Sequence, residues 1–108
     1  MSQPLCKASE VTENGREFRV PGTKNPAYLM IFRRGQQWRA YYNVCPHENR
    51  SLNWAPDKFL LGDDGLLVCP HHGAAFELDS GKCLQGPCKG KSLQTCAISV
   101  REGTVWLD

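Results

Sequence analysis

The sequence has 108 residues, of which 41% are hydrophobic and 22% are charged, and its formal net charge at pH 7 is +2. These values are typical of a folded globular domain, so they exclude a disordered chain and a fibrous repeat, and the length allows one hydrophobic core. The small net charge, with basic and acidic residues interspersed, argues against a nucleic-acid partner. The longest apolar run, residues 27–32, is far shorter than the roughly 20 residues of a membrane-spanning helix. We expect a single domain, residues 1–108, without a membrane segment.

Short runs of aromatic and β-branched residues alternate with turn-forming pairs, and this pattern predicts β-strands joined by tight turns. The first three predicted strands cover residues 16–20, 27–33 and 37–44. The turn signals between them, Pro21-Gly22 and Arg34-Gly35, indicate an antiparallel meander with a tight hairpin at the second turn. Farther along, residues 51–57 could form a short helical turn.

The C-terminal half continues the same pattern. Strands are predicted at residues 66–68 and 74–78, bounded by glycine-containing turns at 62–65 and 79–81. Apolar and polar residues alternate over 95–100, and residues 101–103 turn the chain into a last strand at 104–107. Because no stretch of ten or more residues has a helical period, the sequence predicts an all-β fold of antiparallel sheets, a small barrel or sandwich.

Two Cys-then-His segments carry the chemistry of this sequence. They are Cys45-Pro46-His47 and Cys69-Pro70-His71-His72, and each follows a predicted strand at a turn, with 21 residues, 48–68, between them. Thiolate and imidazole are the usual ligands of soft and borderline metals, and a turn lets residues two or three apart approach one centre. Six cysteines could instead form disulfides, but no export signal precedes them, so we favour metal binding and a cytoplasmic protein.

These two segments and the third segment, Gly81–Cys88, resemble the signature of Rieske ferredoxins and Rieske domains, which is CxH followed by CxxHG and a proline-containing third loop. The resemblance covers residues 44–88 closely and implies a Rieske-like all-β fold with two ligand loops and one [2Fe-2S] cluster. By this resemblance Cys45 and Cys69 bind one iron, and His47 and His72 bind the other through Nδ1. His72 is preferred to His71 because the family places a glycine directly after the ligand, and Gly73 follows His72.

The resemblance also bears on the reduction potential. High-potential Rieske proteins carry a disulfide across the ligand loops and hydroxyl donors near the cluster. In this sequence Glu48 and Asn49 follow His47, and Ala74-Ala75-Phe76 follows Gly73. We therefore predict a potential at the low end of the Rieske range, which runs from about −150 to +300 mV.

The remaining cysteines have separate interpretations. Cys6 and Cys96 are expected to be small buried hydrophobic residues. Cys83 and Cys88 flank Gly86-Pro87 in the third segment and could lie close enough to bridge, but we expect reduced thiols in a reducing cytosol.

The 48–68 segment also allows two interpretations. It could be a loop that faces a partner or covers the cluster. Alternatively, Leu52, Trp54 and Phe59 could pack in a satellite core beneath it, and we favour this second interpretation.

The family resemblance implies an electron carrier between a reductase and an acceptor such as an oxygenase, with no catalytic site of its own. A second candidate is the small subunit of a multicomponent nitrite reductase, since chains of this fold also serve there. A structural zinc site is less favoured, because zinc fingers group their two cysteines together and their two histidines together.

Overall fold

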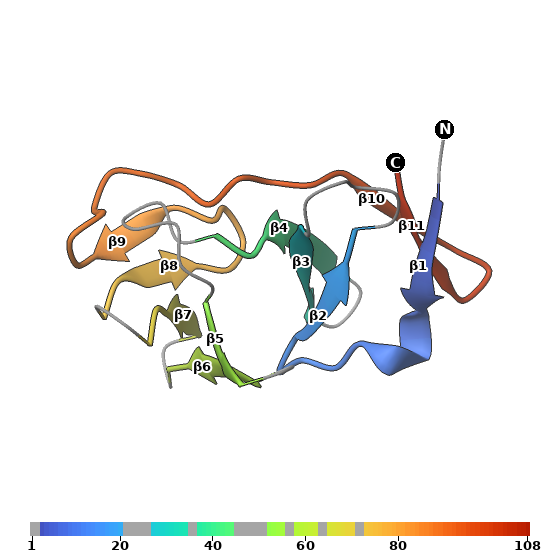
Figure 1. Cartoon of the computed structure of the whole chain (residues 1–108), viewed down its shortest axis with the longest axis horizontal. Coiled ribbons are helices and arrows are strands. Elements are labelled where there is room, and N and C mark those ends of the chain that lie inside the picture. Colours follow the sequence, from blue (N-terminus) through green and yellow to red (C-terminus); the bar gives the residue numbers. More distant parts are fainter. Residues whose placement is uncertain are drawn as a thin grey trace.

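The computed structural model describes residues 3–20, 27–34, 37–44, 52–55, 58–62, 65–70 and 73–108, with backbone only at 34, 54 and 55. In these ranges the chain forms three antiparallel sheets with the strand orders β1-β11-β10, β2-β3-β4 and β5-β6-β7-β8-β9 (Figure 1). The elements are β1 (Gln3–Lys7), the 3-10 turn η1 (Ala8–Glu10), β2 (Arg16–Arg19), β3 (Tyr28–Arg34), β4 (Gln37–Tyr42), β5 (Asn53–Ala55), β6 (Lys58–Leu61), β7 (Leu66–Val68), β8 (Ala75–Glu77), β9 (Cys83–Gln85), β10 (Ile98–Arg101) and β11 (Thr104–Leu107). The predicted all-β fold is confirmed.

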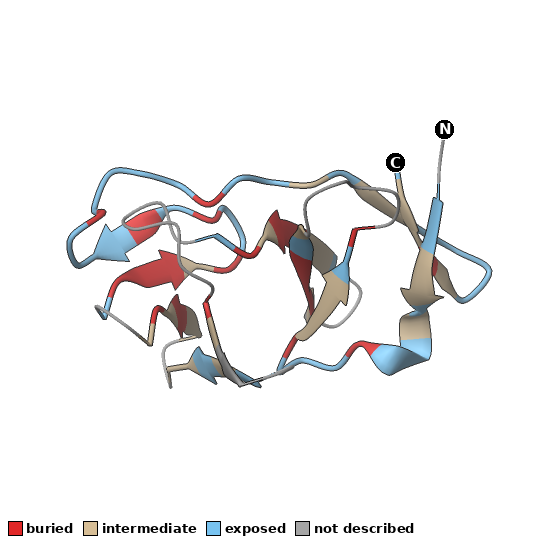
Figure 2. Ribbon diagram, viewed as in Figure 1, coloured by how far each residue is buried: buried red, intermediate tan, exposed pale blue. Residues whose placement is uncertain are grey.

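The middle sheet is buried on both faces, and it separates two hydrophobic cores (Figure 2). Leu29, Met30, Ile31 and Phe32 on β3 are all almost inaccessible to solvent. Because side chains alternate along a strand, Met30 and Phe32 point into a large core shared with the five-stranded sheet, whereas Ile31 points into a small core shared with β1, β10 and β11. The apolar run at 27–32 is therefore a strand covered from both sides.

The large core lies beneath the candidate site. Its buried members are Met30, Phe32, Tyr41, Leu52, Leu67, Cys69, Ala74, Phe76, Leu78, Cys83, Cys88 and Leu93. The small core is built from Val11, Ile31, Ala40 and Val105. Cys6 and Cys96 are half-buried beside the small core, so they are less enclosed than expected.

The strands of the middle sheet, of the β7–β8 hairpin and of the β10–β11 hairpin agree with those predicted from the sequence. The turn signals at 21–22 and at Gly35 lie outside the described residues. A helical turn at 51–57 is wrong for residues 53–55, which form β5 and pair with β6. Strands β1, β5, β6 and β9 were not predicted.

The packing of the 48–68 segment differs from the satellite core that we expected. Leu52 is fully buried in the large core, and Phe59 packs against that core with its ring edge-on to Phe32 at 5.3 Å between centroids. The side chain of Trp54 lies outside the described part of the chain. The described apolar residues of the segment thus belong to the main core.

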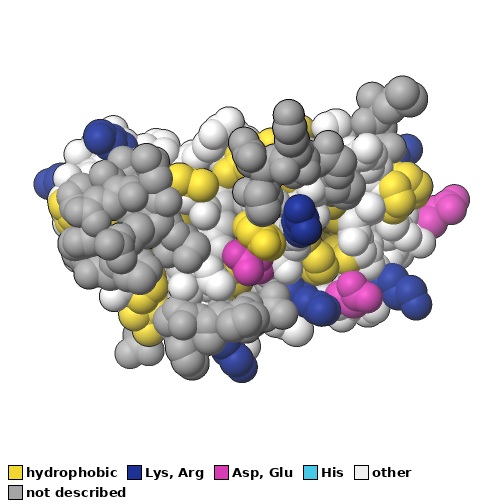
Figure 3. Space-filling model, viewed as in Figure 1, with side chains coloured by type: hydrophobic (Ala, Val, Ile, Leu, Met, Phe, Trp, Pro, Cys, Tyr) yellow, Lys and Arg dark blue, Asp and Glu magenta, His cyan; other side chains and the backbone are white. Residues whose placement is uncertain are grey.

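The molecule measures 38 × 33 × 24 Å, with both termini at the three-stranded β1-β11-β10 sheet and the five-stranded sheet at the opposite end (Figure 1). On the face drawn in Figure 3, basic and acidic side chains are mixed rather than gathered by sign. Among the described residues, no helix is long and apolar enough to cross a membrane.

Candidate metal centre

One of the four predicted ligands, Cys69, lies in the described part of the chain. Cys45, His47 and His72 fall outside it, as does His71. No group of three or more His, Cys, Asp or Glu side chains arranged for a metal ion occurs among the described residues, which is consistent with their containing a single expected ligand. The site is therefore built here from Cys69 and from the residues that hold the two ligand segments in place.

Cys69 directly follows β7, at the loop end of the β7–β8 hairpin. Its N–H donates to the carbonyl of Ala74 at 2.7 Å, and its own carbonyl accepts from the N–H of Gly73 at 3.0 Å. The first bond extends the ladder of β7 and β8 by one pair, and the second ties Gly73 back to Cys69. The sulfur is a free thiol, and the residue is buried in the large core. The second ligand segment is thus anchored at both ends.

The backbone conformation at residue 73 explains why a glycine directly follows the predicted ligand His72. The φ of Gly73 is +72°, in the left-handed region that side-chain-bearing residues avoid. A Cβ built at this position would meet no atom within 4 Å. The glycine is therefore required by backbone conformation and not by lack of space.

The third segment lies directly against the second ligand segment. Gly86 has φ +96°, and a Cβ there would come within 2.7 Å of the Cα of Ala74. Strand β9 pairs with β8 up to this point, with Ala75 opposite Gln85 and an irregularity between Ala75 and Phe76. Gly86 in the third segment thus packs against Ala74, which directly follows the CxxHG segment.

Asn43 secures the ends of the first ligand segment, and it is the buried polar side chain of the described core. Its Nδ2 donates to Asn53 Oδ1 at 2.8 Å and to Glu17 Oε2, while its Oδ1 accepts from the N–H of Leu52 at 2.6 Å. Residue 43 precedes Cys45 and residues 52–53 follow the segment, so one amide joins the two ends. Sequence reasoning missed Asn43, because an asparagine at a strand end suggests only a turn.

Tyr41 connects the middle sheet to the segment that follows β8. Its hydroxyl donates to the carbonyl of Leu78 at 2.5 Å, and its ring fills the space over Gly81, where a Cβ would lie 2.8 Å from Cε1. Burial raises the pKa of Tyr41, so the phenol remains neutral and keeps donating at physiological pH.

The residues present fit a [2Fe-2S] cluster. A buried free cysteine is a suitable thiolate ligand, and its hairpin turn is fixed on both sides. Ala74, Ala75 and Phe76, which follow Gly73, are all buried and carry no hydroxyl donors.

Comparisons with known proteins agree with this arrangement. A family model described as Rieske [2Fe-2S] domain matches residues 1–100. Ferredoxin CarAc of Metapseudomonas resinovorans is 33% identical over 103 residues, which span 95% of this chain and 89% of the relative. A chain in the complex of reduced oxygenase and oxidized ferredoxin of carbazole 1,9a-dioxygenase is 30% identical, with a TM-score of 0.74, 98% of this chain covered and 91% of the other. A chain assigned as an NADPH nitrite reductase small subunit shares the fold alone, at 18% identity and TM-score 0.73, covering 100% and 98% of the two chains.

Proposed function

The chain belongs to the Rieske [2Fe-2S] domain family, and from this we propose that it is a one-electron carrier with its cluster bound by Cys45, His47, Cys69 and His72. The observation that carries the proposal is the closed hairpin turn in which Cys69 is buried and Gly73 adopts the left-handed conformation. These hydrogen bonds at Cys69 and Gly73, the two ends of the CxxHG segment, support the proposal.

The bound cluster would supply reversible one-electron chemistry, at a higher potential than an all-cysteine cluster because two neutral imidazoles replace two thiolates. The protein's own residues hold the ligands and exclude water. Asn43 holds the ends of the first ligand segment through its hydrogen bonds, and the backbone bond between Cys69 and Ala74 holds the second. The buried residues Ala74, Ala75 and Phe76 next to the second segment limit access of solvent.

The electron partners are inferred from the relatives. CarAc is a ferredoxin, and a similar chain occurs in a complex with an oxygenase. We infer that this chain receives electrons from a reductase and delivers them to an oxygenase, and that it has no catalytic site of its own. The nitrite reductase role is less favoured, because that likeness concerns the fold alone.

The chain is proposed to act as one domain over residues 1–108, with the cluster-binding region at about 44–88. Its radius of gyration, 13.2 Å, supports this, since a compact domain of 100 residues has a value of about 13 Å. The protein is proposed to work in the cytoplasm.

The ligand assignment is tested by iron and acid-labile sulfide analysis together with EPR of the dithionite-reduced protein. We expect two irons and two sulfides per chain and a signal with a mean g value below that of the free electron. Cys69→Ser should abolish the signal, and the matched variant Cys96→Ser should keep it. A colourless protein with stoichiometric zinc would refute the proposal.

The potential is tested by a redox titration followed by EPR. The apolar residues Ala74, Ala75 and Phe76 give no hydroxyl donors that would stabilise the reduced state. We expect a midpoint near the low end of the Rieske range, about −150 mV. A midpoint well above 0 mV would contradict this expectation.

A further inference from the structure

Cys83 and Cys88 form a close pair of thiols that binding of the cluster does not use. The S–H of Cys88 donates to the sulfur of Cys83 at 3.2 Å, and the S–H of Cys83 donates to the carbonyl of Gln85 at 3.1 Å. Both residues are 1% exposed, and neither sulfur is part of a disulfide. Since a disulfide bond is about 2.05 Å long, the sulfurs need to approach by only about 1.2 Å to bridge.

The backbone already holds the two cysteines together. The N–H of Cys83 donates to the carbonyl of Lys91 at 2.9 Å, and the N–H of Lys91 donates to the carbonyl of Cys88 at 2.9 Å. The backbones of both cysteines are therefore hydrogen-bonded to Lys91. Formation of a disulfide between them requires side-chain rotation more than backbone movement.

Oxidation would leave little unsatisfied. The two thiol protons depart, and the acceptor that loses its donor is the carbonyl of Gln85, an exposed residue that water can reach.

An oxidant can reach the pair through the loop that covers it. The residues around the thiols, from Leu84 to Pro87 and from Lys89 to Lys91, are exposed. Two of the loop's backbone bonds are long, at 3.2 Å from Lys89 N–H to Gly86 O and 3.3 Å from Gly90 N–H to Cys83 O. Weak bonds on an exposed loop favour local opening, and the exposed Lys89 and Lys91 attract an anionic reagent.

We propose that Cys83 and Cys88 are a reversible dithiol–disulfide pair, oxidised by a low-molecular-weight disulfide such as oxidised glutathione, which fixes the loop that lies against the second ligand segment. One cysteine thiolate attacks the glutathione disulfide, forms a mixed disulfide and releases one glutathione. The second thiolate attacks the mixed disulfide, closes the protein disulfide and releases the second glutathione. The two protein thiols are oxidised, one glutathione disulfide is reduced, and the two thiol protons end on the two glutathione molecules.

The structural effect reaches the cluster end through one contact. Gly86 lies between the two cysteines in the sequence and so close to Ala74 that a Cβ would not fit between them, and Ala74 is two residues after the predicted ligand His72. A bridge across Gly86 restricts the loop at this point, so we expect slower hydrogen exchange at the amides of Lys89 and Gly90.

The experiment incubates the purified, cluster-loaded protein in buffers of increasing oxidised-to-reduced glutathione ratio. Remaining thiols are then trapped with N-ethylmaleimide in denaturant and assigned by peptide mass spectrometry. We expect Cys83 and Cys88 to lose alkylation together, with a monomeric product two hydrogens lighter that dithiothreitol restores. Cys6 and Cys96 should stay alkylatable, since burial raises the pKa of both thiols, that of Cys6 to about 11.

Variants separate an intramolecular bridge from unspecific oxidation. Cys83→Ser and Cys88→Ser should each leave a persistent glutathione adduct on the remaining cysteine, while Cys96→Ser should behave as the unsubstituted protein. Full alkylation of both cysteines at every ratio would overturn the proposal, and so would disulfide-linked dimers as the product. So would unchanged exchange at Lys89 and Gly90 after oxidation. The measurement on the unsubstituted protein decides the matter even if a serine variant fails to fold.

The proposal stands apart from the electron-carrier function, because the pair includes none of the expected ligands. Loss of the two alkylatable thiols in a protein without an EPR signal would reject the cluster and keep the disulfide. A normal EPR signal with both thiols inert would do the reverse.

Discussion

Asn43 is the residue on which the first ligand segment depends most directly. It uses both amide hydrogens and its carbonyl oxygen, so three partners from two other parts of the chain, Glu17 and residues 52–53, meet on one side chain. A network of this kind stabilises only while it is complete, because each partner left behind is a polar group without its bond.

We predict that Asn43→Ala lowers the free energy of unfolding by about 2 kcal/mol, because the buried N–H of Leu52 loses its acceptor. The change is measured as a shift of the urea midpoint by circular dichroism, with cluster absorbance followed separately. The control is Asn14→Ala on an exposed turn, where we expect a change within about 0.5 kcal/mol. Equal shifts for the two variants would contradict the role given to Asn43.

Gly86 and Gly90 form a natural pair for testing the contact between the third segment and Ala74. Their φ angles are +96° and +95°, so an alanine pays the same backbone cost of roughly 1–2 kcal/mol at either position. A Cβ at Gly90 meets open space, whereas one at Gly86 meets Ala74. We predict that Gly86→Ala is more destabilising than Gly90→Ala by about 1–3 kcal/mol.

The same pair of variants tests whether this contact positions the ligand loop. The EPR spectrum of the reduced cluster should change in Gly86→Ala and remain the same in Gly90→Ala. Identical stability and identical spectra in the two variants would show that the third segment does not support the second ligand loop.

At the scale of elements, the β10–β11 hairpin has an unfavourable residue in its turn. Glu102 has φ +52° and Gly103 has φ +75°, the combination of a type I′ turn, in which asparagine is preferred at the first position. We predict that Glu102→Asn stabilises the protein by about 0.5 kcal/mol.

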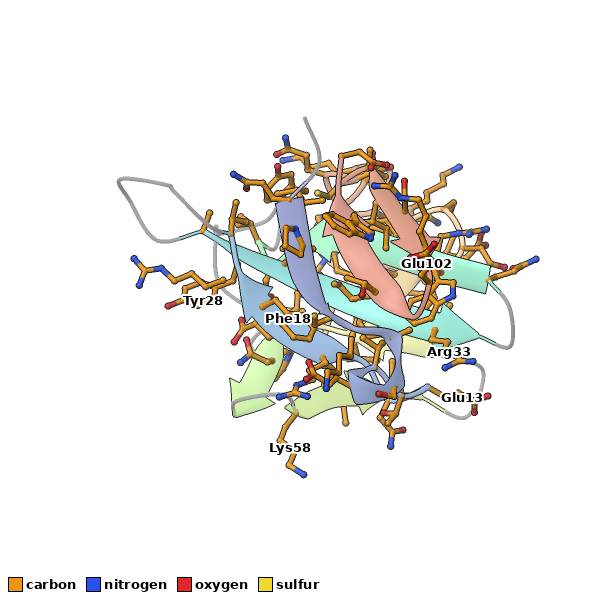
Figure 4. All side chains as sticks on the ribbon, turned by 90° about the vertical axis from the view of Figure 1, so that its right-hand side faces the viewer. Glu13, Phe18, Tyr28, Arg33, Lys58 and Glu102 are labelled. Carbon is orange, nitrogen blue, oxygen red and sulfur yellow. The ribbon has the colours of Figure 1, made fainter. Side chains whose placement is uncertain are left out.

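Thermal unfolding measures this effect, and Glu13→Asn is its matched control. Glu13 is also exposed on a turn, as Figure 4 shows for both residues, but its φ is not positive. The same change of side chain should therefore bring no comparable gain at residue 13. A gain at residue 13 equal to that at residue 102 would contradict the explanation from backbone conformation.

The strands that the sequence predicted are those with a clear signal of their own. The β10–β11 hairpin alternates polar and apolar residues around a glycine turn, and β3 is a long apolar run. Strands β5 and β9 have only three residues each, too few for a period to be visible, and the equally short β7 and β8 were predicted from the glycine-containing turns at 62–65 and 79–81. Strand β1 contains Pro4 and a register shift before Cys6, which hide its pattern.

The ligands of the candidate site could be proposed from the sequence, whereas the residues that support it could not. Spacing and residue types at Cys69 and Gly73 identify a ligand turn without coordinates. The roles of Asn43 and Tyr41 depend on partners far away in sequence, such as Leu78 for the tyrosine hydroxyl. Only the packed chain brings these groups together.

At the scale of the whole molecule, the two cores divide the protein into an end that carries the site and an end that does not. The large core contains Cys69, and the small core, with Val105 at its centre, contains no expected ligand. Stability within one protein can differ between such regions, because each opens with its own free energy.

We predict that removal of the cluster by chelation loosens the two ends unequally. Hydrogen exchange in the β7–β8 hairpin, at the amides of Cys69 and Gly73, should become much faster because bound ligand stabilises the state that binds it. Exchange in the β10–β11 hairpin should change little. Equal loss of protection at both ends would indicate that the molecule unfolds as one unit when the cluster leaves.

Strand β3, which crosses the molecule from Tyr28 to near Arg33 in Figure 4, is apolar on both faces. A shift of its register by one residue would exchange one apolar side chain for another on each face, so hydrophobicity alone does not determine the register. Steric fit makes that choice. The ring of Phe32 rests where Gly15 leaves room for no side chain, since a Cβ there would lie 2.3 Å from Cε1, and the guanidinium of Arg33 stacks over Trp38 at 5.1 Å. The absence of a side chain at Gly15, directly before β2, thus determines which of the two cores each side chain of β3 enters.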